Sequence, residues 1–392
     1  MSLALHLLFA LLLLPLALAC AYLLLLSLCS ARLAVPPSST GRLRFDIVVP
    51  AHDEAASIAR TLASLHRLAW PERQFRILVV CDNCTDDTAQ RARQAGACVL
   101  ERRDESRRGK GYALRHGFDA SLSANWADAV LVIDADSEVT PNLLEACATR
   151  LERGAPAVQV HYGVLNPNSS LRTRLMTLAF ACIHPLRSRA RQRLGLSCGI
   201  RGNGWCLHHE TLRRIPYAAY TLTEDVEYGV ALGLAGCRVH YADEAKVLGE
   251  MVSTELAARS QRRRWEGGRT LLLRRQLPAL LHAAWRSAPC LDLALDLLLP
   301  PLSWLVLAAA LALPLTVVAA LFDAVFTPWL WLDLACTAAL CLYVTRGWRI
   351  SGLGVALLRD LLHVPAYIVW KLRLMLNSGR PAAWVRTTRE QP

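Results

Sequence analysis

Three acidic residues follow directly on an apolar run in the stretch VLVIDADSE (130–138). Asp134 and Asp136 are two positions apart, and side chains at this spacing lie on the same side of an extended segment. Two carboxylates held close together repel each other unless a cation neutralises them. Their oxygens suit Mg²⁺ or Mn²⁺, which commonly bridge carboxylates to phosphate groups. The pair therefore predicts a divalent metal site, and the alternative is a solvated acidic turn after a strand.

Two earlier apolar runs end in polar residues in the same way. The segments DIVVPAHDE (46–54) and FRILVVCDN (75–83) end in His52, Glu54 and Asp82. In open α/β sheets, ligands bind just beyond the carboxyl ends of the strands. We therefore expect these side chains to lie at the rim of a sheet, around a ligand, and not in the core.

Apolar runs and amphipathic segments alternate through the middle of the chain. Continuous apolar strands alternating with helices are typical of a parallel sheet covered on both faces, so the predicted fold class is α/β. Strands are expected within 46–54, 75–82, 97–103 and 129–138, and helices over 55–68, 86–95 and 109–122.

The first block of apolar sequence runs from residue 3 to residue 29. It exceeds the roughly 20 residues that a bilayer-spanning helix needs. A cleaved signal peptide is the alternative, and LALAC at 16–20 resembles a lipoprotein cleavage site. We favour an uncleaved anchor over 1–33, because no Lys or Arg precedes the run and it continues past residue 20. The arginines that follow it place the N-terminus outside and the middle domain, 43–275, in the cytoplasm.

A second apolar block near the C-terminus predicts a transmembrane hairpin over 301–346, because the connection between its two spans has no Lys or Arg. We expect an interfacial helix region at 276–300. We expect an interfacial or re-entrant helix and a basic tail over 352–392, with a third span as the alternative. The arrangement of spans suggests a multi-pass protein of the cytoplasmic membrane.

The net charge of +12 excludes no partner by itself. Basic clusters at 187–193, 259–264 and 274–275 are expected to face anionic lipid headgroups or a phosphorylated ligand. No basic stripe with interleaved aromatic residues is present, so we expect no nucleic acid. Of the thirteen cysteines, only Cys81 and Cys84 form a CxxC pair, which we interpret as reduced thiols in a turn and not as a redox site.

Three further segments combine acidic, basic or aromatic residues with residues that can cap a helix or permit close backbone approach. In TED, Thr223 can cap a helix whose positive end favours the two acids. SQRRRWEGG (260–268) places three arginines before a tryptophan, which a basic interfacial helix would also explain. In RGNGWCLHH (201–209), two glycines permit close backbone approach and a tryptophan offers a flat face for a sugar.

Taken in order, these pieces resemble the processive-type family 2 glycosyltransferases, the membrane synthases related to cellulose, chitin, hyaluronan and poly-N-acetylglucosamine synthases. The resemblance covers about 45–270. The matching elements are PAHDE (with Asp53 where Asn is usual), Asp82 in VVCDN, GKGYAL, Asp136 in DAD, Asp225 in TED, QRRRW at 261–265 and WVRTTRE near the C-terminus.

The resemblance implies a glycosyltransferase A-type, Rossmann-like domain flanked by transmembrane helices, and an inverting transfer that uses Mg²⁺ or Mn²⁺. Asp225 would be the catalytic base, and Asp134 and Asp136 would hold the metal. The implied nucleotide-sugar-binding residues are Pro50, Ala51, His52, Glu54, Asp82, Lys110, Asp134, Gln261, Arg262, Arg264 and Trp265. The implied acceptor-binding residues are Gly202, Gly204, Trp205 and Glu224.

The expected donor is a nucleotide diphosphate sugar, and UDP is the usual nucleotide in that family. The first hypothesis is a synthase that extends a β-linked polysaccharide, with the growing glycan as acceptor and polysaccharide-export proteins as partners. The alternative is transfer of one sugar to a lipid acceptor in the membrane. A catalytically silent membrane protein that binds a nucleotide sugar is a third hypothesis, against which the intact set of motif residues argues.

Overall fold

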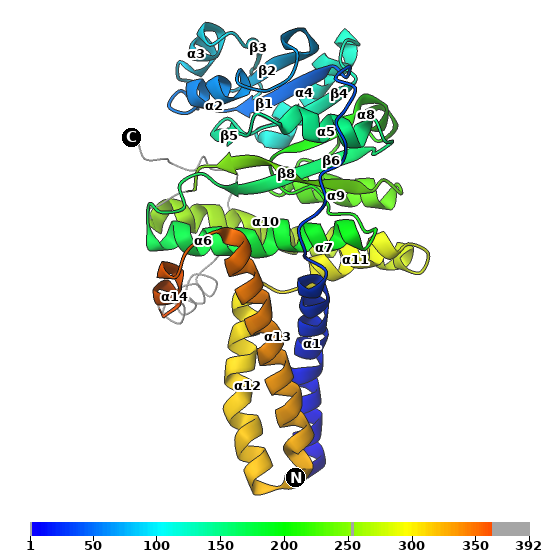
Figure 1. The fold of residues 1–392 in the computed structure, drawn as a ribbon, viewed down its shortest axis with the longest axis vertical. Coiled ribbons are helices and arrows are strands. Elements are labelled where there is room, and N and C mark those ends of the chain that lie inside the picture. The colour runs from blue at the N-terminus through cyan, green and yellow to red at the C-terminus, as the bar shows by residue number, and fades with distance from the viewer. Residues whose placement is uncertain (1, 252–254, 363–392) are drawn as a thin grey trace.

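The computed structural model describes residues 2–251 and 255–362, except for the side chains of residues 2, 255–264, 266, 356 and 358. Figure 1 shows three levels: a sheet with its covering helices, a layer of helices beneath it, and three long helices that extend away from that layer. The cavity described below is bordered by the first two levels.

The eight-stranded sheet has the order β3-β2-β1-β4-β7-β6-β8-β5. Strands β3, β2, β1 and β4 are parallel neighbours, and β6 and β8 are also parallel. Strand β7 is antiparallel to both of its neighbours, and β5 is antiparallel to β8. The strands are β1 (Phe45–Ala51), β2 (Phe75–Asp82), β3 (Cys98–Arg102), β4 (Ala129–Val132), β5 (Ser137–Val139), β6 (Ala157–Val164), β7 (Trp205–His208) and β8 (Val239–Gly249).

The predicted α/β class with a Rossmann-like sheet is confirmed. The sheet is expected from the sequence to be mostly parallel and is found to be mixed, with four parallel and three antiparallel strand pairs. The helices of this domain are α2 (Ile58–Leu65), α3 (Thr88–Gln94), α4 (Lys110–Ala124), α5 (Leu143–Leu151), α8 (His209–Arg214) and α9 (Glu224–Leu234), with a short 3₁₀ turn η1 (Glu72–Gln74).

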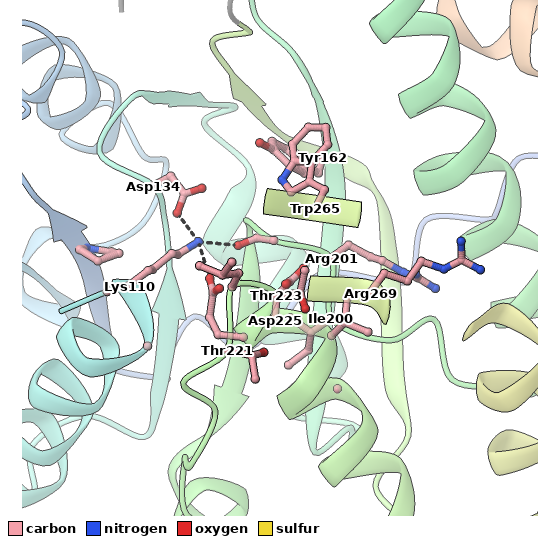
Figure 2. Close-up of a pocket in the computed structure, with 18 of the residues that line it drawn as sticks. Lys110, Asp134, Tyr162, Ile200, Arg201, Thr221, Thr223, Asp225, Trp265 and Arg269 are labelled. Carbon is pink, nitrogen blue, oxygen red and sulfur yellow. Dashed lines mark hydrogen bonds and ion pairs between the residues drawn. The ribbon is translucent and has the colours of Figure 1, made fainter. Parts of the chain in front are cut away.

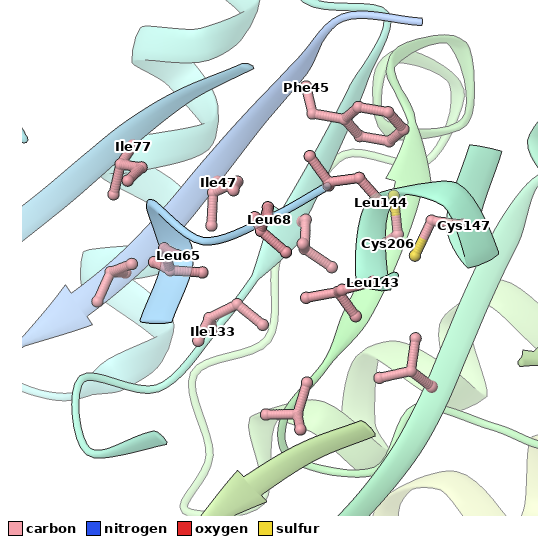
Figure 3. Packing of buried hydrophobic residues seen from close by; sticks show 14 of the residues in the cluster. Phe45, Ile47, Leu65, Leu68, Ile77, Ile133, Leu143, Leu144, Cys147 and Cys206 are labelled. Carbon is pink, nitrogen blue, oxygen red and sulfur yellow. The ribbon is translucent and has the colours of Figure 1, made fainter. Parts of the chain in front are cut away.

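Successive side chains of β1 point to opposite faces of the sheet and so belong to two separate core clusters. Ile47 and Val49 point into the cluster that includes α2 and α5, shown in part in Figure 3. Val48 points into the other cluster, against α4. On that side a methyl group at Gly117 would lie 2.6 Å from Val48, so a glycine is needed for α4 to lie this close to the strand. Period-two alternation therefore fixes how α4 and its first residue, Lys110, are placed over the sheet.

The segment predicted as one strand over 129–138 is divided in two. Strand β4 ends at Val132 and β5 begins at Ser137, so Asp134 and Asp136 lie in a turn and not on an extended segment. The turn forms because the amide of Ser137 donates to the carbonyl of Asp134, while the amide of Asp134 donates to Oδ1 of Asn203. The expectation that Asp134 and Asp136 lie on the same side of an extended segment is therefore wrong, although both carboxylates still line one cavity.

Within the part of the chain that the structure describes, three helices are long and apolar enough to cross a membrane. They are α1 (Ser2–Leu28), α12 (Leu302–Phe322) and α13 (Thr327–Ser351), and they coincide with the expected anchor and hairpin. They pack on one another through a common cluster that includes Leu13, Leu305 and Leu340. The turn η3 (Ala324–Phe326) joins α12 to α13.

The layer between the sheet and the long helices contains α6 (Leu171–Ala181), the π-helix η2 (Cys182–Leu186), α7 (Arg187–Arg193), α10 (Glu255–Ala284) and α11 (Ala288–Leu298). The expectation that the cluster 187–193 faces lipid is wrong for Arg187 and Arg191. Both are buried, because they form ion pairs with carboxylates of α11. Helix α14 (Ala356–Leu361) follows the hairpin. Of the interfacial or re-entrant helix and basic tail predicted over 352–392, the part from residue 363 onward lies outside the described residues.

Candidate active site

A cavity of about 520 Å³ opens at the carboxyl ends of β1, β2 and β4. Its other walls are the segment 199–202, the start of α9, and parts of α10 and α11. Figure 2 shows Lys110 and Asp134 at one end, Arg201 and Arg269 at the other, and Asp225 between them. The cavity thus contains the strand-end acids and the TED motif together, which the sequence motifs alone do not establish.

Lys110, the first residue of α4, connects three segments of the cavity wall. Its ammonium group lies 2.6 Å from Oδ1 of Asp134 and 3.6 Å from Oε1 of Glu224, and it donates to the carbonyl of Gly202 at 2.9 Å. Burial alone would lower the pKa of Lys110, but Asp134 and Glu224 raise it above its usual range. Burial raises the pKa of Glu224 to about 7, in spite of Lys110. Lys110 is therefore a fixed positive charge among carboxylates.

Asp134 and Asp136 both line the cavity. The hydroxyl of Ser137 donates to Asp136 at 3.2 Å, and the side chain of Asn203 holds both Asp134 and Ser137 through hydrogen bonds of 3.0 and 2.7 Å. Carboxylate oxygens in a polar turn are hard ligands of the kind that Mg²⁺ and Mn²⁺ prefer. The residues present therefore fit the expected divalent metal.

Asp82, at the end of β2, forms the far wall of the same cavity. It is buried, and its carboxylate accepts from Nη1 of Arg102 at 2.5 Å, which compensates its charge. Burial nevertheless raises the pKa of Asp82 above its usual value. The ring of His52 lies 2.6 Å from the carbonyl of Asp82 and ties the ends of β1 and β2 together. This end of the cavity is a shaped polar wall at the strand ends.

Asp225 is the second residue of α9, which Thr223 precedes as the N-cap residue without a side-chain capping hydrogen bond. Two glycines let other segments approach it. A methyl group at Gly202 would lie 3.7 Å from Oδ2 of Asp225, and Gly202 has a φ of +73° that favours glycine. A methyl group at Gly268 on α10 would lie 2.6 Å from Thr223. The loop thus lies against the carboxylate of Asp225, and α10 packs against Thr223, the residue before α9.

Aromatic rings form the wall above Asp225. Tyr162 and Phe180 pack edge to face with their ring centroids 5.2 Å apart, and the rings of His184 and Trp265 lie 4.7 and 6.4 Å from Phe180. All four side chains line the cavity. Burial lowers the pKa of His184 well below its usual value, so this ring is neutral. Such a wall offers flat apolar faces of the kind on which sugar rings stack.

The cavity brings together most of the residues that the sequence indicates. Those that line it are Pro50, Ala51, His52, Glu54, Asp82, Lys110, Asp134, Asp136, Gly202, Glu224, Asp225 and Trp265. The side chains of Gln261, Arg262 and Arg264 lie outside the part of the chain whose side chains are described, although the backbone there belongs to α10.

Two expected acceptor residues are elsewhere. Trp205 is 1% exposed and packs in the core against Phe118 and Tyr217, because it begins strand β7 and points to the α4 face of the sheet. Gly204 is also buried, and a methyl group there would lie 2.6 Å from Val160 of β6. A glycine is required at position 204 for the strands to pack, and not to admit an acceptor sugar. The assignments of Trp205 and Gly204 to the acceptor site are therefore wrong.

Several cavity residues were missed by the sequence analysis. They include Tyr162, Phe180, His184, Arg201, Arg269 and Asp296. One pattern could have indicated Asp296: Asp292 and Asp296 are four residues apart in an otherwise apolar helix, so they lie on one face. The arginines at 187 and 191 have the same spacing.

Residues 43–268 match the family model described as "Glycosyltransferase like family 2". A β-monoglucosyldiacylglycerol synthase from Nostoc sp. is 29% identical over 237 residues, which cover 58% of this chain and 50% of that protein. Glucomannan 4-β-mannosyltransferase 7 from Arabidopsis thaliana is 23% identical over 249 residues, covering 60% of this chain and 44% of that protein. The chain thus matches about half the length of these curated relatives.

A solved structure has the same fold. The mannosyltransferase from Pyrobaculum calidifontis, determined in complex with GDP-Man and Mn²⁺, superposes with a TM-score of 0.51. It is 17% identical, and the match covers 83% of this chain and 97% of that chain. At this identity the likeness concerns the fold.

Proposed function

Because the chain belongs to the family 2-like glycosyltransferases, enzymes that transfer a sugar from a nucleotide sugar, we propose that the cavity binds a nucleotide diphosphate sugar with Mg²⁺ or Mn²⁺ and transfers the sugar, with inversion, to a hydroxyl group. One observation carries this proposal: Asp134, Asp136 and Asp225 line one cavity of about 520 Å³. A donor sugar held at the first two is then within reach of the third.

In this proposal the strand-end wall holds the donor. Asp82, kept in place by Arg102, faces the nucleoside together with Pro50 and His52. Asp134 and Asp136 hold the divalent cation, which when bound supplies Lewis-acid neutralisation of the diphosphate. Lys110 adds a cationic donor at the same place, since its ammonium group is fixed among the cavity carboxylates. These groups stabilise the negative charge that develops on the leaving nucleoside diphosphate.

Asp225 is the proposed general base. It accepts the proton of the acceptor hydroxyl while the hydroxyl oxygen attacks the anomeric carbon from the face opposite the diphosphate. One such displacement inverts the anomeric centre, so an α-linked donor yields a β-linked product. Positioned base catalysis typically contributes about 10²–10⁴ in rate. The aromatic wall of Tyr162, Phe180 and Trp265 is the proposed platform for the acceptor.

The first candidate acceptor is a growing β-linked polysaccharide, as the TED and QRRRW motifs of the synthases suggest. The relative from Arabidopsis thaliana that is named for a glucomannan supports this candidate. In this case the catalytic domain works on the cytoplasmic side of a bacterial inner membrane, with α1, α12 and α13 as spans and with export proteins as partners.

A lipid acceptor is the second candidate, and the lining of the cavity favours it. Apolar side chains from η2, α10 and α11 line the cavity, namely Ile183, Leu272, Leu293 and Leu297, beside the charged Arg201, Arg269 and Asp296. These helices form the layer that sits on α1, α12 and α13. A lipid headgroup would therefore reach Asp225 along a wall that combines apolar and charged side chains. The relative from Nostoc sp. is named for such a product.

Two assays test these proposals. Purified protein in proteoliposomes is screened with UDP-sugars and GDP-sugars for nucleotide release with Mn²⁺. No release from any donor, with intact protein, would contradict the enzymatic proposal. Labelled product is then separated by chromatography: label that stays at the origin indicates a polymer, and label that migrates with lipid indicates a single transfer.

A further inference from the structure

Five charged side chains lie together between the cavity and the long helices: Arg187, Arg191 and Asp292 are buried, and Arg201 and Asp296 are partly buried. Arg187 and Arg191 come from the start and middle of α7, Arg201 from the loop before β7, and Asp292 and Asp296 from α11. Arg191 is fully buried. Buried ion pairs contribute little net stability, because desolvation cancels most of the attraction, whereas removal of one partner is costly. A network of this size therefore calls for a role beyond stability.

Asp296 is the centre of this network. One carboxylate oxygen lies 2.7 Å from Arg191 and 3.2 Å from Arg187, and the other lies 2.8 Å from Arg201. Burial alone would raise the pKa of Asp296, but the three guanidinium groups hold it well below its usual value. Asp296 is thus a charged carboxylate that lines the cavity and has two oxygens fully engaged by arginines.

The network reaches two of the three apolar helices. The hydroxyl of Tyr22 on α1 donates to Asp292 at 2.7 Å and accepts from Arg191 at 2.7 Å. The hydroxyl of Tyr343 on α13 accepts from Arg187 at 2.8 Å and donates to the carbonyl of Cys182 in η2. The contacts of Tyr343 are buried and those of Tyr22 are partly buried, and both residues lie in the C-terminal halves of their helices. Figure 1 shows that α1 and α13 approach the helix layer with their C-terminal ends.

On its other side the network reaches the proposed catalytic groups. Arg201 precedes Gly202, whose carbonyl accepts from Lys110 and whose Cα faces Asp225. The side chain of Arg201 is held at both ends of its guanidinium group, by Asp296 and by the carbonyl of Cys198. Figure 2 shows Arg201 extending from beside Asp225 toward the end of the cavity away from Lys110. A shift of Asp296 would therefore move the loop that lies against Asp225.

We propose that Asp296 is a positioning residue that holds Arg201, and with it the glycine loop 199–204, against Asp225. Through the network, the position of α1 and α13 relative to the catalytic domain then affects the position of this loop on the acceptor side of the cavity. This deepens the proposed function and rests on it for the catalytic consequence. The structural consequence, an ordered loop, does not depend on any enzymatic activity. The two can therefore be tested separately.

The structural test is hydrogen–deuterium exchange on the full chain in detergent micelles. Asp296→Asn is expected to speed exchange of the backbone amides in 199–204 at least tenfold. The matched control is Asp243→Asn, which breaks another buried ion pair of α7, that of Arg189 at 2.8 Å, but does not line the cavity. It should leave 199–204 unchanged. Equal exchange in the two variants would overturn the proposal.

Milder variants keep the test decisive if Asp296→Asn does not fold. Tyr22→Phe and Tyr343→Phe each remove one hydroxyl group that links the network to α1 or α13, and each is expected to speed exchange in 199–204 two- to fivefold. If neither has an effect, the membrane helices are not coupled to the loop and the proposal fails.

The kinetic test uses whichever sugar nucleotide the wild-type protein turns over in proteoliposomes. Arg201→Lys is expected to lower turnover at least tenfold and to raise the KM for that nucleotide by a smaller factor, because the loop lies against Asp225 and reaches the donor side only through its hydrogen bonds to Lys110 and to the turn of Asp134. A KM for the nucleotide that rises in parallel with the loss of turnover would contradict the assignment. If exchange responds as expected but no nucleotide is turned over by the wild-type protein, the proposed function fails and the positioning network stands.

Discussion

The ammonium group of Lys110 lies 2.6 Å from Oδ1 of Asp134, so the proposed metal ligand already has a cation beside it. The same ammonium group lies 3.6 Å from Glu224, the neighbour of the proposed base. Lys110 therefore lies between the donor and acceptor halves of the cavity. Its charge favours the anionic diphosphate and opposes a second cation at Asp134.

Because of this position, replacing the lysine with a neutral residue should strengthen metal binding and weaken donor binding. In Lys110→Gln, Mn²⁺ should bind more tightly in the absence of nucleotide, by about threefold or more, because Asp134 loses its competing cation. The KM for the sugar nucleotide should rise at least tenfold, because a phosphate contact is lost. Electron paramagnetic resonance of free Mn²⁺ and steady-state kinetics measure the two quantities. Weaker Mn²⁺ binding in the variant without nucleotide would show that Lys110 does not compete at the metal site.

The proposed base predicts a defect confined to turnover. Asp225→Asn should lower kcat by about 10²–10⁴, the usual contribution of a positioned base, with calorimetric binding of UDP and Mn²⁺ unchanged within twofold. Asp119→Asn serves as control, because Asp119 is exposed on α4, pairs with Arg115 on the same helix and does not line the cavity. Turnover by Asp225→Asn at the rate of the control would remove the base from the mechanism.

Glu224 predicts a pH-dependent stability. Its pKa is raised by burial to about 7 in the folded protein and is about 4.3 in an unfolded chain. The folded protein therefore holds this proton more tightly, so the stabilising contribution is complete below about pH 4.3 and is lost as the pH rises through about 7. Glu224→Gln resembles the neutral form at every pH.

The difference in Tm between Glu224→Gln and the wild-type protein should accordingly become more positive from about pH 4.5 to about pH 7.5. Thermal unfolding in detergent, after treatment with a chelator, measures it. A difference that stays constant across this range would mean that Glu224 titrates near its ordinary pKa in the folded protein.

Gly111 predicts a steric effect on the helix that carries Lys110. A methyl group there would lie 2.2 Å from the carbonyl oxygen of Ala219, and a backbone oxygen cannot move out of the way cheaply. Gly111→Ala should cost about 1–3 kcal/mol of stability, the usual range for overpacking, and should weaken donor binding because α4 is displaced. Gly354→Ala is the control, since nothing lies within 4 Å of its added methyl group. Equal Tm values for the two variants would contradict the close approach.

Much of this site could be predicted from sequence because its parts are local. A strand that ends in acids and a helix that begins after a glycine place Asp82, Asp134 and Lys110 at one rim by topology alone. The family motifs then indicate Asp225 on the facing helix. The apolar blocks predict α1, α12 and α13 from length and hydropathy, which need no tertiary information.

The errors concern residues whose role depends on distant partners. Trp205 has the composition of a sugar platform, yet strand pairing with β4 turns its ring into the core. The arginines of 187–193 look like a lipid-facing cluster, yet Arg187 and Arg191 are neutralised by acids about 100 residues later in the chain. A single sequence gives the spacing of such groups but not their pairing.

The central claim is that the metal-binding acids and Asp225 act on a single sugar in one cavity. Its most direct test is a cryo-electron microscopy structure of Asp225→Asn in nanodiscs with Mn²⁺ and the nucleotide sugar that the wild-type protein turns over. We expect the diphosphate to lie beside Asp134, Asp136 and Lys110, with the anomeric carbon directed toward residue 225. A diphosphate bound away from Asp134 and Asp136, or a sugar directed away from residue 225, would contradict the account.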